Sequence, residues 1–441
     1  MATPERLTAQ LERLVRVEQR EKRLASLAAA VVRDGETIWE TAVGLADVEA
    51  GLEATPDTQF RLGSITKTFT AAAIMQLRDA GELDLEDALD LHVEGAAHRP
   101  TLRRLLSHTS GLQRETQDDA WVSLRFASVD ELVATLGEAE QVLSPGARFH
   151  YSNLAYALLG VVVERVSGMP YADYVRRRLL EPLGLTRTTF LPEAPAAAGY
   201  VAQPYADGVW DAVQVETSAW VAAGQLWGTV RDLCRWAAFL CDPDERVVAK
   251  ASVEEMRAVQ AIDDHDRWTS GYGLGLVLRR DGERILVGHS GAMPGFIASM
   301  VVSPADKVGA AALTNESEAA LGDLTLALVA RTVEEWPVPP EAWRPGDVPP
   351  NDVVPLLGVW FFEATRVVLR WREGRLEARF DDTPAWKPSS AFEREGDDRW
   401  RTVSGPERGE LLRVERDERG AVTHLFWTGY PLTREPGPWR G

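Results

Sequence analysis

Helical and strand-like patterns of apolar residues follow one another along the chain in a definite order. Residues 5–24 repeat apolar side chains at helical spacing, and two strand-like segments, Leu27–Arg33 and Glu36–Gly44, flank an Asp34-Gly35 turn. Strand patterns return much later. They are predicted at Gly273–Arg280, Arg284–His289, Ile297–Ser303 and Val308–Thr314, before a last helix near Ser317–Glu335. We therefore expect one antiparallel sheet assembled from both ends of this region.

The segment between these two sets of strands is mostly helical in pattern. Residues 64–80 place Phe69, Ala73 and Leu77 on one face, and Gly81 follows at a position where helices favour glycine. Further periodic apolar faces are predicted at Val129–Ala139, Asn153–Ser167, Tyr171–Leu180 and Thr229–Leu240. The order of elements predicts a mixed α/β (α+β) domain in which this helical block lies beside the sheet.

Dense proline marks a break in the pattern near residue 336. From Trp336 to Pro350 the periodicity disappears, which is typical of a linker. Short strands are predicted beyond it at Val367–Trp371, Arg375–Phe380, Arg399–Val403, Glu410–Arg416 and Val422–Trp427. This spacing predicts a small antiparallel β-barrel. The expected organisation is a domain at residues 1–335, a linker at 336–355 and a barrel at 356–441.

Composition and charge exclude several classes of function. The 441 residues are 45% apolar, and 67 acidic against 48 basic residues give a formal charge of −19. Nucleic acids and anionic membranes select for clustered positive charge, so neither is expected as a partner. The chain has no apolar run long enough to span a membrane, and the apolar stretch Leu24–Val32 continues into a strand pattern. We expect a cytoplasmic protein. Cys234 and Cys241 are too few for a disulfide framework.

Lysine is rare in this chain, and each lysine is therefore informative. Only five of the 48 basic residues are lysine, at positions 22, 67, 250, 307 and 387. Arginine cannot lose its proton near neutral pH, whereas a buried lysine can. A lysine beside a nucleophile thus deserves closer inspection than an arginine in the same place.

Ser64 and Lys67 lie three residues apart at the start of the helix predicted over 64–80. At this spacing both side chains share a helix face, so the amine can reach the hydroxyl and remove its proton. The helix N-terminus adds a positive potential that suits an oxyanion. Taken alone, the pair is explained more simply by an N-capping serine and a solvated lysine.

Two later motifs supply further candidates. Tyr151 precedes Asn153, where a phenol can shuttle a proton and an amide can hold a substrate carbonyl. His289 and Gly291 end a predicted strand, whose edge can offer backbone N–H groups to an oxyanion; a glycine there lets substrate lie against the edge. Each motif alone also fits a structural role.

Together, in this order, the motifs resemble the serine β-lactamase and penicillin-binding-protein family, and in particular its class C branch. That branch also contains D-aminopeptidases, D,D-peptidases and esterases. The similarity covers about residues 25–335. The segments that carry it are Thr58-Gln-Phe-Arg-Leu-Gly-Ser64-Ile-Thr-Lys67, Leu105-Leu-Ser-His-Thr-Ser-Gly-Leu112, Pro145-Gly-Ala-Arg-Phe-His-Tyr151-Ser-Asn153, Glu181-Pro-Leu-Gly-Leu185, Ala223-Gly-Gln-Leu-Trp-Gly-Thr229 and Gly288-His-Ser-Gly-Ala-Met-Pro-Gly-Phe296.

The resemblance implies roles for individual residues. Ser64 would form an acyl-enzyme, and Lys67 would act as its base or electrostatic partner. Tyr151 would exchange a proton with the leaving group and later with water, although the division of labour between lysine and tyrosine stays open. Asn153 would bind the substrate carbonyl and Lys67. The backbone N–H groups of Ser64 and Ala292 would form the oxyanion hole, at the strand edge that Gly291 leaves uncovered.

His289 departs from the family pattern, because it occupies the place of the lysine in the third motif. That lysine is a permanent cation that helps hold the carboxylate of penicillins and of D-Ala-D-Ala peptides, whereas histidine is mostly neutral near pH 7. We expect a serine hydrolase acting on small amides, peptides or esters, of D-aminopeptidase-like or D,D-peptidase-like character. The alternatives are a weak β-lactamase and a non-catalytic penicillin-recognising or peptide-binding protein.

The remaining candidates point to no cofactor or metal. His108, in a Thr-Ser-Gly turn, is expected to make a structural hydrogen bond. Asp263, Asp264, His265 and Asp266 are consecutive, and such residues on one loop rarely share an ion. The expected partner is a small-molecule or peptide substrate. The C-terminal barrel resembles the lipocalin-like barrels of some family members and can also serve to join two copies of the chain.

Overall fold

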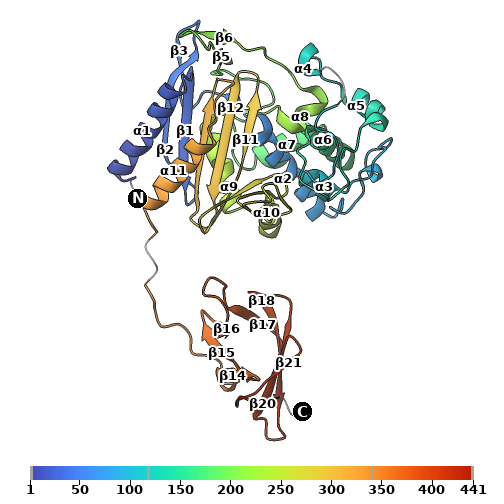
Figure 1. The fold of residues 1–441 in the computed structure, drawn as a ribbon, viewed down its shortest axis with the longest axis vertical. Coiled ribbons are helices and arrows are strands. Elements are labelled where there is room, and N and C mark those ends of the chain that lie inside the picture. The colour runs from blue at the N-terminus through green and yellow to red at the C-terminus, as the bar shows by residue number, and fades with distance from the viewer. Residues whose placement is uncertain (1–2, 117–119, 339–341, 439–441) are drawn as a thin grey trace. The chain divides into compact units, whose positions relative to one another are not determined.

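The computed structural model describes residues 3–116, 120–338 and 342–438, and the chain divides into two compact units between residues 338 and 339. The first unit is built on a nine-stranded antiparallel sheet with the order β3-β2-β1-β13-β12-β11-β10-β9-β8 (Figure 1). Its strands are β1 (Ser26–Arg33), β2 (Glu36–Asp47), β3 (Leu52–Glu53), β8 (Ala261–Ile262), β9 (Ser270–Tyr272), β10 (Val277–Asp281), β11 (Arg284–Met293), β12 (Phe296–Ser303) and β13 (Val308–Thr314).

The prediction of a sheet assembled from both ends of the region is confirmed. β1 pairs antiparallel with β13, so that Leu27 lies opposite Thr314 and Arg33 opposite Val308. Every residue of both strands is buried. Burial on both faces requires a layer of helices on each side of the sheet, and it explains why these strands are continuous apolar runs.

Helices cover both faces of the sheet. α1 (Glu5–Glu21) and α11 (Gly322–Glu335) pack together on one face, where Leu7, Leu11 and Leu328 share an apolar cluster with β1 and β13 (Figure 1). α9 (Val230–Cys241) packs on the other face against β1 and β13. This second face continues into the larger apolar core that the helical block shares with the sheet.

The helical block surrounds α2 (Thr66–Asp79), which is buried almost along its whole length. Its other helices are α3 (Leu102–Leu106), α4 (Ala120–Ser123), α5 (Val129–Thr135), α6 (Asn153–Ser167), α7 (Tyr171–Val175), α8 (Val221–Gly224) and α10 (Lys250–Met256), with 3₁₀ turns η1 (Gly63–Ile65), η2 (Leu89–Leu91), η3 (Leu136–Glu138) and η5 (Ser218–Trp220) and a π-helical turn η4 (Arg176–Leu180). Two small ribbons pair β4 (Phe60–Arg61) with β7 (Trp227–Gly228) and β5 (Tyr200–Ala202) with β6 (Val209–Asp211). α2 packs against α6 and α8, and the turn η1 that precedes it contacts β11 and β12, so the N-terminus of α2 lies between the helical block and the sheet.

Several predicted boundaries differ from the structure. Three of these differences have a clear physical reason. Residues 273–280 do not form one strand, because Gly275 turns the chain with φ +76° between β9 and β10. A Cβ atom at Gly275 would lie 2.4 Å from the Cβ atom of Ala71, so this turn is set by contact with α2. β11 continues past His289 to Met293, because β12 pairs with it over that whole length. The last helix begins at Gly322 rather than near Ser317, whose hydroxyl instead accepts the N–H of Gly295.

The second unit is an eight-stranded antiparallel sheet in sequential order that closes into a barrel. Its strands are β14 (Gly358–Phe362), β15 (Thr365–Arg372), β16 (Arg375–Phe380), β17 (Ser390–Gly396), β18 (Arg399–Ser404), β19 (Leu411–Arg416), β20 (Val422–Trp427) and β21 (Tyr430–Leu432), preceded by the 3₁₀ turn η6 (Val354–Leu356). A bridge between Phe361 and Thr433 joins the first strand to the end of the last. Apolar side chains, including Trp360 and Trp427, fill the interior.

The barrel prediction is therefore confirmed. Sequence reasoning missed β14, β17 and β21, which lack a clear alternation of apolar and polar residues. Among the described residues, none of the helices combines the length and the apolar character that crossing a bilayer requires.

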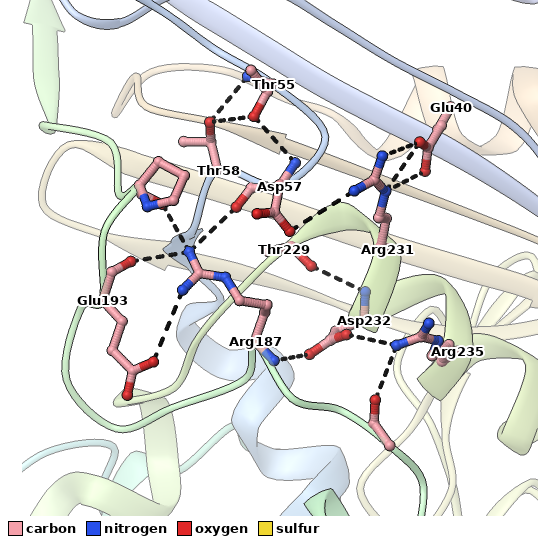
Figure 2. A network of polar contacts seen from close by, with 12 residues as sticks. Glu40, Thr55, Asp57, Thr58, Arg187, Glu193, Thr229, Arg231, Asp232 and Arg235 are labelled. Atoms are coloured by element: carbon pink, nitrogen blue, oxygen red, sulfur yellow. Dashed lines mark hydrogen bonds and ion pairs between the residues drawn. The ribbon is translucent and has the colours of Figure 1, made fainter.

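A polar network ties β2 and residues 187–188 to α9 (Figure 2). Arg231 of α9 forms an ion pair with Glu40 of β2. Asp232, only 2% exposed, accepts hydrogen bonds from the backbone N–H of Arg187 and from the Thr188 hydroxyl, at 2.7 and 3.0 Å. Burial raises the pKa of the Asp232 carboxyl, and these donors oppose the rise. The carboxylate thus fixes Arg187 and Thr188 against α9.

Removing the Asp232 carboxylate should destabilise the first unit. Asp232→Ala leaves two buried donors without an acceptor, and we expect a loss of about 2–3 kcal/mol. Asp232→Asn keeps one oxygen acceptor and should lose less. Differential scanning calorimetry of the full chain measures both changes, and equal melting temperatures in all three proteins would contradict this role.

Candidate active site

Ser64 lies in η1, the 3₁₀ turn that leads directly into α2. The segment before it is anchored by the pairing of β4 with β7. Gly63 has φ +52°, and the Thr66 hydroxyl donates to its carbonyl oxygen at 2.7 Å. The chain therefore turns sharply at residue 63 and enters the helix with Ser64 on its first turn, where the helix N-terminus faces the hydroxyl.

Lys67 is fully buried beneath Ser64. Its Nζ atom donates to the Ser64 Oγ atom at 3.0 Å and to the carbonyl oxygen of Ala223 at 2.8 Å. The aromatic rings of Tyr151 and Tyr156 lie 5.0 and 5.5 Å from it. Burial lowers the pKa of Lys67 to about 7; the nearby Glu115 carboxylate opposes this shift. An appreciable fraction of Lys67 is thus an uncharged amine at neutral pH, able to accept a proton.

The buried side chain of Arg61 forms hydrogen bonds to residues on both sides of Ala223 in the chain. The Arg61 guanidinium donates to the carbonyl oxygen of Val215 at 2.6 Å and to Gln225 Oε1 at 3.0 Å. Gln225 Oε1 also accepts the backbone N–H of Thr217 at 3.0 Å. These bonds fix the segment that carries Ala223, and with it the second partner of the Lys67 amine.

Tyr151 completes a group of three side chains around the Ser64 hydroxyl. Its hydroxyl shares a hydrogen bond with the Ser64 side chain, and burial holds the pKa of the phenol well above its ordinary value. The phenol is therefore protonated at neutral pH. The hydroxyl of Ser64 contacts a weakly basic amine on one side and a proton donor on the other.

His108 supports the tyrosine rather than the reaction. Its Nδ1 atom accepts the backbone N–H of Ser152 at 3.0 Å, and its ring lies 4.2 Å from the ring of Tyr151. The side chain is completely buried, and burial holds its pKa well below the ordinary value. The structural hydrogen bond expected of His108 is present, and it fixes the turn that presents Tyr151.

Two glycines bring strand β11 against the turn at Ser64. A Cβ atom at Gly291 would lie 1.9 Å from the carbonyl oxygen of Leu62 and 2.9 Å from the backbone nitrogen of Ser64. A Cβ atom at Gly63 would lie 2.7 Å from the backbone nitrogen of Ala292. The space beside Gly291 is therefore filled by the protein's own backbone. We had expected the glycine to leave this space open for substrate. The same contact brings the amides of Ser64 and Ala292 to one place.

A methyl group at residue 291 should separate these two backbones. We expect Gly291→Ala to lose most hydrolytic activity and to lower the melting temperature, because the clash is with main-chain atoms that cannot move aside. Gly322→Ala is the matched control, since a Cβ atom there would meet nothing within 4 Å. Steady-state kinetics and thermal unfolding of both variants test the contact, and an active Gly291→Ala protein of normal stability would contradict it.

His289 is a buried, neutral member of the site. Its Nδ1 atom lies 2.5 Å from the carbonyl oxygen of Ser290, which can only accept, so Nδ1 carries the proton. Its Nε2 atom then accepts from the Tyr272 hydroxyl at 3.0 Å. Burial and the neighbouring Lys67 lower the pKa of His289 to about 3. The imidazole therefore carries no positive charge at neutral pH.

The resemblance implied that Asn153 would bind the Lys67 amine, but the asparagine side chain binds a different partner. Its Nδ2 atom donates to Glu115 Oε1. The backbone N–H groups of Asn153 and Leu154 both donate to the carbonyl oxygen of Arg114, at 2.9 and 3.2 Å. These bonds fold the 114–115 segment over the N-terminus of α6 and bring the Glu115 carboxylate to the asparagine.

One open cavity of about 820 Å³ connects the predicted site residues; its lining includes Ser64, Tyr151, Asn153, His289 and Ala292. Sequence reasoning did not identify Arg114, Glu115 and Tyr272, which also line it. The charged pair at 114–115 lies just beyond the family-like segment that ends at Leu112, separated from it by Gln113, and this position was the only available signal.

The acidic run at Asp263–Asp266 forms no metal cluster. The Asp264 carboxylate accepts the backbone N–H groups of Thr269 and Ser270, each at 3.0 Å. Within the described ranges of the chain, no three potential ligand side chains gather at one point.

Comparison with known proteins gives the chain clear relatives. The Beta-lactamase family model matches residues 11–333, and a domain of unknown function, DUF7586, matches residues 349–434. The chain is 32% identical to penicillin-binding protein 4 of Amycolatopsis lactamdurans over 367 residues, which is 77% of this chain and 94% of that protein. It is 26% identical over 319 residues (69% of this chain) to protein flp of Staphylococcus aureus, but spans only 62% of that protein's length.

Solved structures agree with this result. The octameric penicillin-binding protein homologue of Pyrococcus abyssi superimposes with a TM-score of 0.68 at 25% identity, over 97% of this chain and 99% of that one. A D-stereospecific amidohydrolase from a Streptomyces species superimposes with a TM-score of 0.64 at 26% identity, over 73% of this chain and 98% of that one.

Proposed function

The chain belongs to the Beta-lactamase family, and on that premise we propose that it is a serine hydrolase that forms an acyl-enzyme through Ser64 and acts on small amides, peptides or esters. One observation carries this proposal. The Ser64 hydroxyl accepts from the buried Lys67 amine at 3.0 Å and shares a hydrogen bond with the protonated Tyr151 phenol. A base and an acid on the same hydroxyl are what acyl transfer requires.

The positions of these groups suggest the division of roles that the sequence left open. The uncharged Lys67 amine removes the Ser64 proton as the Oγ atom bonds to the substrate carbonyl carbon. The resulting oxyanion is stabilised by the amides of Ser64 and Ala292. When the carbonyl–leaving-group bond breaks, Tyr151 protonates the departing nitrogen or oxygen, and the proton on Lys67 returns to the phenolate. Water then attacks the ester with the same groups in reverse.

The neutral His289 narrows the substrate class. A substrate carboxylate gains no cation from a histidine whose pKa is about 3. The site therefore favours an amidase, an aminopeptidase or an esterase over a penicillinase or a carboxypeptidase. The similarity to a D-stereospecific amidohydrolase supports the proposal of amidase activity.

Replacing Ser64 tests the nucleophile directly. We expect the wild-type protein to be labelled by a fluorophosphonate probe on the peptide that contains Ser64, and to hydrolyse p-nitrophenyl esters. Ser64→Ala should lose the label and at least about a thousandfold in kcat. Mass spectrometry locates the label; undiminished labelling of the variant would refute the assignment.

The pH dependence tests Lys67 as the base. A lysine must be uncharged to accept a proton, and its pKa is lowered to about 7. The acylation rate should therefore be low at pH 5, half-maximal near pH 7 and level above it. Lys67→Arg keeps the positive charge but cannot lose its proton, so this variant should be inactive across the range. A flat wild-type profile between pH 5 and 9 would rule out this role.

A further inference from the structure

The cavity is lined by three carboxylates that the proposed chemistry does not use, those of Glu115, Asp263 and Asp323. Glu115 lines the cavity together with Ser64 and Tyr151, and its side chain is 29% exposed. The Asn153 amide donates to its Oε1 atom, so one oxygen is fixed while the carboxylate still faces the cavity. A partly exposed carboxylate held in position beside a nucleophile is a ready partner for a cation.

The other charged groups around this cavity make an anionic ligand unfavourable. His289 is neutral, and the Lys67 amine is occupied by Ser64 and Ala223. Asp263 and Asp323 add two further carboxylates to the lining, which make three with Glu115. Two arginines, Arg114 and Arg279, also line the cavity. The Arg114 side chain is 63% exposed; its Nε atom lies 3.9 Å from Glu115 Oε1, and its guanidinium lies over the Tyr151 ring at 5.0 Å.

The negative charge of Glu115 acts on the region around Ser64, where the α-ammonium group of a bound substrate would lie. Burial is the larger influence on both groups: it lowers the pKa of Lys67 and raises that of Tyr151. The Glu115 charge raises the pKa of both, so its field reaches the two side chains that flank Ser64. In an amino-acid amide, the α-ammonium nitrogen is separated from the carbonyl carbon by a single atom. A substrate carbonyl at Ser64 therefore brings an α-ammonium group into this field.

We propose that Glu115, held by Asn153, binds the free α-ammonium group on the acyl side of the substrate. This rests on the proposed acyl transfer at Ser64, and it narrows the substrate to amino-acid amides, amino-acid esters and peptides with an unblocked N-terminus. An N-acylated substrate lacks the charge and leaves the carboxylate with only its long ion pair to the exposed Arg114 side chain, at 3.9 Å. A substrate with a carboxylate in the same place is repelled by Glu115.

The test compares two substrates that differ only in the ammonium group. Alanine p-nitroanilide, as each enantiomer, is compared with propanoyl p-nitroanilide, which has a hydrogen in place of the amine. Wild-type kcat/KM should favour the better alanine enantiomer, and Glu115→Gln should reduce this ratio by about tenfold to a hundredfold. Glutamine retains an acceptor for Asn153. Any effect of the lost charge on Lys67 is common to both substrates and cancels in the ratio.

Arg114→Gln is the matched control, because it removes the neighbouring charge from the same segment. Removing a cation should not lower the preference for an ammonium substrate. An unchanged ratio in Glu115→Gln would overturn the proposal, as would an equal fall of the ratio in both variants.

A binding measurement separates this proposal from the proposed hydrolysis. In the Ser64→Ala protein, alaninamide and propanamide are titrated and their binding followed by NMR. Alaninamide should bind more tightly, and the additional Glu115→Gln change should remove that advantage. If the wild type hydrolyses nothing but this preference is found, the proposed function fails and the ammonium site stands. Equal binding of the two amides would overturn the ammonium site.

Discussion

Burial of one lysine amine is the constraint on which this site depends. The Lys67 Nζ atom lies between the Ser64 hydroxyl and the carbonyl oxygen of Ala223, without access to solvent. A buried ammonium ion is costly, and the charge of the nearby Glu115 carboxylate offsets only part of that cost. Burial therefore lowers the pKa of the amine to about 7, well below the ordinary value for lysine, and the amine becomes a base near neutral pH.

The rest of the first unit keeps this amine buried and correctly placed. α2 is enclosed by the helical block and the sheet, so that Lys67 cannot extend into water. The Arg61–Gln225 contact fixes the segment that carries the Ala223 carbonyl. The close approach of Gly63 to β11 seals the side of the site where the two amides meet. Loss of any of these contacts would admit water and return the lysine to its charged form.

Sequence patterns predicted the parts of the fold that are determined locally. Asn153–Ser167 and Val308–Thr314 were predicted to the residue as α6 and β13, because both are strongly apolar over their whole length. The motif residues Ser64, Lys67 and Tyr151 do meet around one hydroxyl.

Features that depend on contacts between distant segments could not be read in the same way. The break at Gly275 is set by Ala71, about two hundred positions earlier in the chain. The place of Glu115 depends on hydrogen bonds with the N-terminus of α6. The neutral state of His289 follows from burial that no local pattern reveals.

Direct titration of Lys67 tests the central claim most simply. The chain has only five lysines, so a protein labelled with ¹³C at lysine Cε should give a spectrum in which each can be followed. A Lys67→Met variant identifies the signal. Lys67 should titrate near pH 7, since its pKa is about 7, well below the ordinary value for lysine. A Lys67 signal that stays in the charged form up to pH 9 would contradict the account of the site given above.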